Sequence, residues 1–384
     1  MHIMSTVDII GLDSRSGRTI RVTTENGMIA RIEEISEDAD LYLSAGFVDL
    51  QVNGYAGFDL NADQISIETV AGLVNAMLFQ GVTCCVPTLI SAPEEQLCCA
   101  LRVIAKARRS DPTVSACVPV IHMEGPAISP RDGYRGAHPA HAIRPPSLAE
   151  FDRWQDAADG LVGIVTLSPH FDESVAYIAA LVKRGVRIAI GHTHASPEQI
   201  SAAVDAGASL STHLGNGIAL EIPRHRNAIW RQLADDRLSA SFIADGHHLP
   251  WDVLKVMLRA KGLERSVLVS DAVALAGMPA GVYSTPVGGQ VEVRSDGSLR
   301  VHGSEILAGS TASLSRCIGW AVQMTGVPLH DALAMATVNP GRFVGGRGRM
   351  ALGSRADLVR FLWKERVEIK DVWLAGHPIN TNQS

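Results

Sequence analysis

Eight apolar runs rich in β-branched residues recur along the chain, and each closes on polar side chains. Most are separated by stretches with helical periodicity, for example residues 66–81, 94–110 and 173–185. This regular alternation of strands and helices predicts an α/β fold with a parallel sheet. Eight units favour a closed (β/α)8 TIM barrel over an open doubly wound sheet, and no GxGxxG motif follows the first run to support a dinucleotide fold. The runs begin at Gly46, Gly81, Val118, Leu161, Val186, Ala208, Leu238 and Ser266.

The start of one helix can be predicted in detail after the fifth run. Ser196 suits the N-cap, Pro197 the first helical position and Gln199 the third, which together form a capping box. The sequence therefore predicts a strand that passes directly into a helix at this point.

The two ends of the chain have a different pattern, with short strand-like alternation and turn glycines. We predict a small β-sandwich domain formed by residues 1–45 together with residues 346–384, which leaves residues 46–345 for the barrel. Two unrelated terminal extensions are the alternative.

Composition excludes several classes of partner. The 384 residues are 46% hydrophobic and 19% charged, as in a globular protein with much buried surface. A net charge of −6 with no basic stripe argues against nucleic acid. No segment has the roughly 18 uninterrupted apolar residues of a membrane span, so we expect no membrane partner and a cytoplasmic protein. The six cysteines lack CxxC spacing, and we expect them to be buried thiols.

The active-site face of such a barrel lies at the carboxyl ends of its strands. The third, fifth and sixth runs end near Glu124, His192 and His213, and the eighth ends near Asp271. A carboxylate and two imidazoles around one open position match a catalytic zinc site, where the metal activates water. Asp271 could then move the proton. A lone histidine at a strand end is more often structural, as we expect for His122, but four convergent residues favour a hydrolytic site.

Motifs along nearly the whole chain resemble the N-acetylglucosamine-6-phosphate deacetylases of the amidohydrolase superfamily. The matching segments are AGFVDLQVNGYAGFD, HMEGPAIS, GAHP, GHTHAS, THLGN, IADGHH, LVSDAVALAG, LAGS, ATVNPGR and GSRADLV. The resemblance implies a barrel flanked by a β-sandwich, a homodimer, and hydrolysis of the acetyl amide of an amino-sugar phosphate to the free amine and acetate.

The resemblance also implies roles for individual residues. Glu124, His192 and His213 match the metal ligands, and Asp271 matches the general base and acid. His248 matches the residue that contacts the substrate carbonyl oxygen. The remaining matches are substrate contacts, namely His138, Asn216 and Gly217.

The number of metal ions depends on the first run. Gln51 and Asn53 stand where some relatives use an HxH pair for a second metal, and neutral amides are weak zinc ligands. We therefore expect one divalent ion rather than two, zinc in the first instance with iron, manganese or cobalt as alternatives.

Several positions depart from the family pattern. The phosphate-binding arginine of the family, which reaches the partner subunit's substrate, could be either Arg224 or Arg226 here, or neither if both are solvated. His170 and His194 replace residues that the family commonly uses at two strand ends, so they could re-tune the pocket. His194 could also add a metal ligand, because it lies two residues from His192.

These departures leave alternatives to N-acetylglucosamine 6-phosphate deacetylation. The first is an amidohydrolase for another N-acyl amino sugar, with a different hexosamine or without phosphate. The second is a catalytically silent binding protein that keeps the fold, although the expected ligands and Asp271 are all present.

Overall fold

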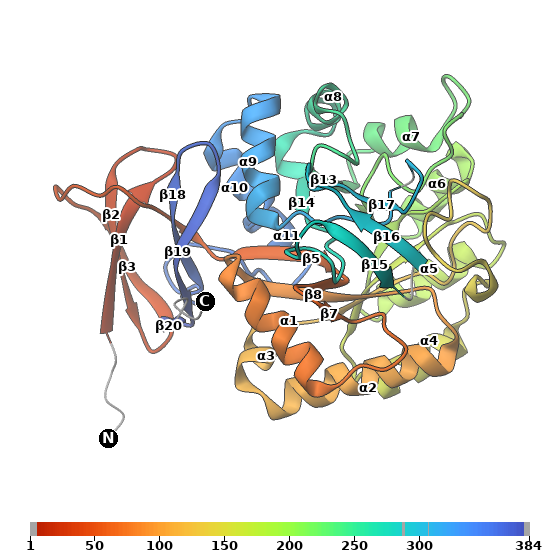
Figure 1. The fold of residues 1–384 in the computed structure, drawn as a ribbon, viewed down its shortest axis with the longest axis horizontal. Helices are drawn as coiled ribbons and strands as arrows, with labels where there is room; N and C mark the ends of the chain where they lie inside the picture. The colour runs from red at the N-terminus through yellow and green to blue at the C-terminus, as the bar shows by residue number, and fades with distance from the viewer. Residues whose placement is uncertain (1–5, 286–288, 306, 380–384) are drawn as a thin grey trace.

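The computed structural model describes residues 6–285, 289–305 and 307–379. Figure 1 shows a barrel surrounded by helices and, beside it, a separate sheet in which red N-terminal strands lie next to blue C-terminal strands. Among the described residues, no helix combines the length and the apolar character needed to cross a membrane.

The eight predicted runs form one eight-stranded parallel sheet in chain order, which confirms the predicted barrel. The last strand returns to the first: Ala272 pairs with Val52 in a parallel bridge, and the Ser270 amide donates to Asp49 Oδ1 at 3.2 Å. The barrel strands are β5 (Phe47–Val52), β8 (Val82–Ile90), β9 (Ile121–Glu124), β10 (Val162–Leu167), β11 (Arg187–Ile190), β12 (Leu210–Ser211), β13 (Ser239–Ile243) and β14 (Ser266–Val269).

Helices follow the barrel strands as the sequence pattern predicts. The capping box at Ser196 and Gln199 is present in full, with Pro197 in the first turn. The helices are α1 (Ile67–Phe79), α2 (Glu94–Ser110), α3 (Pro112–Cys117), α4 (Leu148–Ala157), α5 (Ser174–Lys183), α6 (Pro197–Asp205), α7 (Ala228–Ala234), α8 (Trp251–Lys261), α9 (Leu314–Thr325), α10 (Leu329–Met335) and α11 (Val338–Gly341), with 3-10 turns at Ala140–Ala142 and Leu263–Arg265.

Apolar side chains fill both faces of the barrel sheet, as expected where helices cover a parallel sheet. One cluster, which includes Val48, Leu50, Cys84 and Val86, lies inside the barrel. A much larger cluster lies between the strands and the surrounding helices. Packing on both faces fixes the strand ends, and with them the side chains at the mouth of the barrel. Five of the six cysteines are buried, whereas Cys99 on α2 is exposed and corrects the expectation for that residue.

Both termini contribute to a single seven-stranded sheet, in the order β20-β19-β18-β4-β1-β2-β3. Residues from both ends, including Ile20, Val22, Leu358 and Trp373, share one apolar cluster. The two ends are therefore one unit rather than unrelated extensions, while the boundaries at residues 45 and 346 stay a prediction. The strands are β1 (Thr6–Asp13), β2 (Thr19–Glu25), β3 (Met28–Glu34), β4 (Tyr42–Ala45), β18 (Leu358–Trp363), β19 (Val367–Leu374) and β20 (His377–Ile379).

A small antiparallel sheet lies between β14 and α9 and was not predicted from the sequence. It consists of β15 (Gly281–Thr285), β16 (Gly289–Val293) and β17 (Leu299–Val301), in that order. We call residues 273–309, in their described parts, the insert. A further short hairpin, β6 (Gly54–Tyr55) with β7 (Phe58–Asp59), follows β5.

A buried lysine links α8 to the segment before β13, and its removal should destabilise the fold. Lys261 is 1% exposed, and its Nζ donates to the carbonyl oxygens of Gln232, Asp235 and Leu238 at 2.7, 3.0 and 3.0 Å. Lys261→Met removes three hydrogen bonds to buried carbonyls, of which, among the described residues, only that of Asp235 keeps a second donor, the Leu238 amide, so we expect the free energy of unfolding to fall by about 2–4 kcal/mol in urea titrations. Lys183→Met on the exposed end of α5 is the control and should change it little. Equal stabilities of the two variants would contradict this role.

Candidate active site

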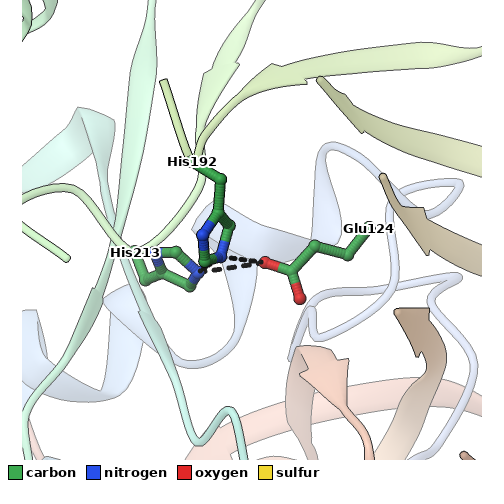
Figure 2. Close-up of side chains that lie close together, drawn as sticks. All are labelled: Glu124, His192 and His213. Carbon is green, nitrogen blue, oxygen red and sulfur yellow. Dashed lines mark hydrogen bonds and ion pairs between the residues drawn. The ribbon is translucent and has the colours of Figure 1, made fainter. Parts of the chain in front are cut away.

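Two imidazole nitrogens and one carboxylate oxygen meet at the carboxyl ends of the barrel strands. Glu124 Oε1 lies 3.0 Å from His213 Nε2 and 3.4 Å from His192 Nε2, and the two nitrogens are 3.1 Å apart. Figure 2 shows the two rings and the carboxylate pointing toward one another. One ligand atom from each residue lies within 4.8 Å of the others, so the three can share one metal ion.

The backbone also has an unusual conformation at most of the residues of this site. Glu124 is the last residue of β9, whereas His192, His213 and Asp271 each lie two residues beyond the end of β11, β12 and β14. Those three residues have positive φ angles of 47°, 28° and 48°. L-residues adopt this left-handed region rarely and at a cost, and they do so mostly at functional sites. The sharp turns direct the three side chains into the mouth of the barrel.

The ring of His192 is fixed on both sides. Its Nδ1–H donates to the carbonyl oxygen of Tyr134 at 2.9 Å, and its Nε2 faces Glu124 and His213. Gly217 has a φ of +59°, and a Cβ there would lie 2.7 Å from His192 Nδ1. Gly217 therefore supports the ring by allowing its backbone to approach closely. Such an outer partner sets the tautomer of a metal-binding histidine.

Glu124 is buried and ionised. Burial alone would raise its pKa, but hydrogen bonds from His192 and His213, and the charges on these rings, hold the pKa of Glu124 well below its usual value. Gln51 Nε2 donates to Glu124 Oε1 at 2.9 Å. Gln51 thus orients the Glu124 carboxylate in this structure.

Asp271 is the second buried carboxylate of the site. Burial, followed by the negative charge of Glu124, raises the pKa of Asp271 to about 6. Asn53 Nδ2 donates to Asp271 Oδ1 at 2.7 Å and so fixes the orientation of the carboxylate. The other oxygen is left for exchange of a proton with a molecule in the cavity.

His248 is held by a carboxylate that sequence reasoning did not assign to the site. Its Nδ1–H donates to Asp245 Oδ2 at 2.7 Å, and Asp245 Oδ1 accepts the backbone amides of His247 and His248. Although burial would raise it, hydrogen bonding and the charge of His248 lower the pKa of Asp245 to about 2. The ring consequently presents Nε2 to the cavity. The signal was available in the sequence, since Asp245 stands three residues before His248 in DGHH.

His138 has a defined tautomer as well. Its Nδ1 accepts the backbone N–H of Ser91 at 3.2 Å, so a neutral ring carries its hydrogen on Nε2, which lies 3.9 Å from Glu124 Oε2. Burial, and then the charge of His192, lower the pKa of His138 to about 3. His138 is therefore a neutral hydrogen-bond donor toward the cavity.

The cluster opens into a cavity of about 250 Å³. Asn216 and Gly217 line it, as do His138, His248 and Asp271. The described lining contains no lysine or arginine, whereas it includes three carboxylates. One of them, Asp59 of β7, was not singled out in the sequence, and aliphatic residues of the insert close another side.

Other predicted residues lie outside the described cavity lining. Arg224 and Arg226 are both exposed in the segment between β12 and α7, where Arg226 pairs with Glu198. His170 and His194 contact each other, with ring centroids 4.2 Å apart. Their Nδ1 atoms lie 2.7 and 2.6 Å from the hydroxyl oxygens of Ser168 and Ser129. His194 therefore belongs to a separate polar cluster in this structure, and a ligand role for it has no geometric support.

His122 behaves as a core histidine, in agreement with the sequence interpretation. Its Nδ1 donates to the Leu50 carbonyl oxygen at 3.2 Å, and its Nε2 is 2.7 Å from Thr166 Oγ1. Both ring nitrogens have partners inside the protein.

A parallel barrel with two imidazoles, one carboxylate and a further buried aspartate at its strand ends defines a hydrolase class that relies on a metal ion. The amidohydrolase family model matches residues 42–379. N-acetylgalactosamine-6-phosphate deacetylase of Escherichia coli O157:H7 is 32% identical over 361 residues, which cover 91% of this chain and 92% of that protein. N-acetylglucosamine-6-phosphate deacetylase of Homo sapiens is 34% identical, covering 87% and 82%.

Solved structures agree with the sequence comparison. N-acetyl-D-glucosamine-6-phosphate deacetylase of Mycobacterium smegmatis, solved in complex with N-acetyl-D-glucosamine-6-phosphate, has a TM-score of 0.87 and 31% identity over 97% of this chain and 99% of that one. The chain belongs to the amidohydrolase family and, within it, to the N-acetylglucosamine-6-phosphate deacetylases that its motifs resemble. It is accordingly a hydrolase of carbon–nitrogen amide bonds rather than a silent binding protein.

The ligand geometry predicts how metal binding responds to single substitutions. We expect His213→Ala to weaken metal binding by more than about tenfold, since the loss of a ligand should exceed the loss of a supporting partner. His194→Ala is the control, because His194 lies two residues from His192 but binds Ser129. Metal content after dialysis against graded chelator, measured by mass spectrometry, tests both. A comparable loss in His194→Ala would place that residue among the ligands.

Proposed function

We propose that this protein is a metal-dependent deacetylase that hydrolyses the N-acetyl amide of N-acetylglucosamine 6-phosphate to glucosamine 6-phosphate and acetate. The observation that carries the proposal is the convergence of Glu124, His192 and His213 beside the buried carboxylate of Asp271. The names of the relatives supply the substrate class.

The three side chains suit one divalent ion. His192 has its Nδ1–H committed to Tyr134, so its Nε2 is a free donor atom for a metal, and His213 Nε2 and Glu124 Oε1 face the same point. Two nitrogens and one carboxylate oxygen are a zinc-type donor set, and we propose zinc as the ion. A single ion suffices, because Gln51 and Asn53 donate their amide hydrogens to the carboxylates.

In the proposed reaction, the metal ion activates the amide and the water, and Asp271 transfers the proton. When bound, the ion supplies Lewis acidity, which polarises the amide carbonyl and makes water acidic enough to react near neutral pH. Asp271 accepts a proton from the attacking water at the oxygen that Asn53 leaves free. It then passes that proton to the amide nitrogen as the carbon–nitrogen bond breaks, which converts a poor leaving group into a neutral amine.

His248 and His138 orient the substrate in this proposal. His248 presents Nε2 to the cavity and contacts the carbonyl oxygen, while the negative charge of Asp245 stabilises positive charge on the ring. His138 donates from Nε2 to a substrate oxygen. Asn216 and Gly217 complete the side of the cavity that holds the sugar.

The phosphate requires a cation that the described cavity lining does not contain. We propose that a homodimer supplies it, with Arg224 or Arg226 of one subunit reaching the substrate of the other. Both arginines are exposed, and Leu220, in the same segment, is fully exposed as well. We further propose a cytoplasmic location, because all six cysteines are free, as expected in a reducing compartment.

A second substrate is favoured by one specific observation. The relative from Escherichia coli O157:H7 that matches 91% of this chain is named for N-acetylgalactosamine 6-phosphate, whereas others of similar identity are named for the glucosamine compound. The two sugars differ at one hydroxyl, so either could fill a cavity of this kind.

A four-substrate panel tests the proposed function. Metal-loaded protein is given both N-acetylhexosamine 6-phosphates and both unphosphorylated sugars, and acetate release is measured. We expect kcat/KM for the phosphorylated forms to be higher by about tenfold or more, the value of a charged hydrogen bond. Equal rates with unphosphorylated sugars would remove the phosphate from the proposal, and no acetate from any of the four would contradict the deacetylase.

Asp271→Asn tests the proposed proton transfer. The amide keeps the shape but cannot accept the proton, so kcat should fall by about 10²–10⁴-fold while bound metal is unchanged. Asp172→Asn, at an exposed position before α5, is the matched control. Steady-state kinetics and metal analysis of the same preparations decide the outcome, and near-normal turnover by Asp271→Asn would refute the assigned role.

A further inference from the structure

One wall of the cavity is aliphatic and comes from the insert. Val273, Leu275, Val291, Leu299 and Ala308 line the cavity and pack against one another in a separate apolar cluster. Leu275, Val291 and Leu299 are buried. We call these five residues the insert wall.

The insert wall is attached to the same backbone as the reacting groups. Asp271 precedes Val273 by two residues, and the Val273 amide donates to the Ser310 carbonyl oxygen at 3.1 Å. Between them, Ala272 pairs with Val52 on one side and Ser310 on the other. Gly309 lies so close to Val273 that a Cβ on it would be 2.6 Å from Val273 Cγ1. The wall therefore has a fixed position beside the proton-transfer group.

Polar and apolar lining residues come largely from different segments of the chain. Most hydrogen-bonding side chains come from the loops after β5, β9, β12 and β13, among them Asp59, His138, Asn216 and His248. A sugar ring carries hydroxyls on most of its carbons, and burying them against aliphatic groups without partners costs free energy. The sugar belongs on the polar side, which leaves the insert wall for the part of the substrate that has no hydroxyls.

We propose that the insert wall binds the acyl chain and that this protein removes N-acyl groups longer than acetyl, such as propionyl and butyryl, from the amino sugar. This inference rests on the proposed function, since it concerns the acyl side of the same amide. Water supplies the hydroxyl to the acyl carbon and a hydrogen to the nitrogen, so the products are the free carboxylic acid and the amine.

The first experiment compares acyl lengths in the metal-loaded protein. The substrates are N-acetyl-, N-propionyl- and N-butyrylglucosamine 6-phosphate, and kcat/KM is measured from amine release. Burying one methylene is worth about a factor of four, so the butyryl compound should equal or exceed the acetyl compound. Hydrolysis of the acetyl compound with the butyryl compound more than 100-fold slower would overturn the inference and leave the proposed function standing. No turnover of any compound would overturn both.

Substitutions in the insert test whether the insert wall causes the preference for acyl length. Val291→Phe narrows the cavity and should lower the butyryl-to-acetyl ratio of kcat/KM by tenfold or more. Val282→Phe, at a 50% exposed position on β15, is the matched control and should leave the ratio unchanged.

Leu299→Ala shortens a wall side chain that is 2% exposed and should move the ratio the other way, toward the longer chain. Opposite shifts for Val291→Phe and Leu299→Ala support the wall even if one variant is less stable, because the ratio is internal to each preparation. Identical ratios in all three variants and the wild type would overturn the assignment.

Discussion

The site depends on a buried carboxylate that two imidazoles keep ionised. Glu124 lies inside the barrel mouth, where burial alone would favour its protonated form, and His192 and His213 reverse that preference. Three lone-pair atoms can face one point only if three strands end at fixed positions around a ring. The barrel is closed by the pairing of Ala272 with Val52, so it meets this requirement, and packing on both faces of the sheet prevents the ends from moving apart.

The closed barrel also holds three residues in an unfavourable backbone conformation. His192, His213 and Asp271 have left-handed φ angles, which cost roughly 1–3 kcal/mol each for residues other than glycine. All three turns follow strands whose last two residues are buried. Packing of these strands in the core therefore offsets the free-energy cost of the left-handed φ angles. Each of these three side chains therefore lies within two residues of its strand, and Asn53 orients the carboxylate of Asp271 as Gln51 orients that of Glu124 on β9.

Much of this arrangement could be predicted from the sequence, because the barrel pattern is local. Each strand ends next to the polar residue that it positions, so the list of strand ends contained Glu124, His192, His213 and Asp271. Asp245 was missed as a support for His248 although it stands three residues away, since its role appears only when the hydrogen bond is seen.

The insert was missed because its strands, at most five residues long, have no helical partners and follow no barrel period. The positions of Arg224 and Arg226 depend on a loop without periodicity.

The chain thus separates the reaction from the choice of substrate. Reacting groups lie at strand ends whose geometry the barrel fixes, whereas the insert wall and Arg224 lie in segments that connect a barrel strand to the helix after it. The three carboxylates in the described cavity lining would repel a phosphate, so its recognition has to come from outside that lining. Under the roles proposed for the insert wall and for Arg224 or Arg226, changes in these segments would alter the acyl group or the sugar that is accepted without moving Glu124, His192, His213 or Asp271. The departures from the family pattern at His170 and His194 also lie outside the reacting cluster. This distribution is the expected one where a barrel keeps its chemistry and varies its specificity through the connecting segments.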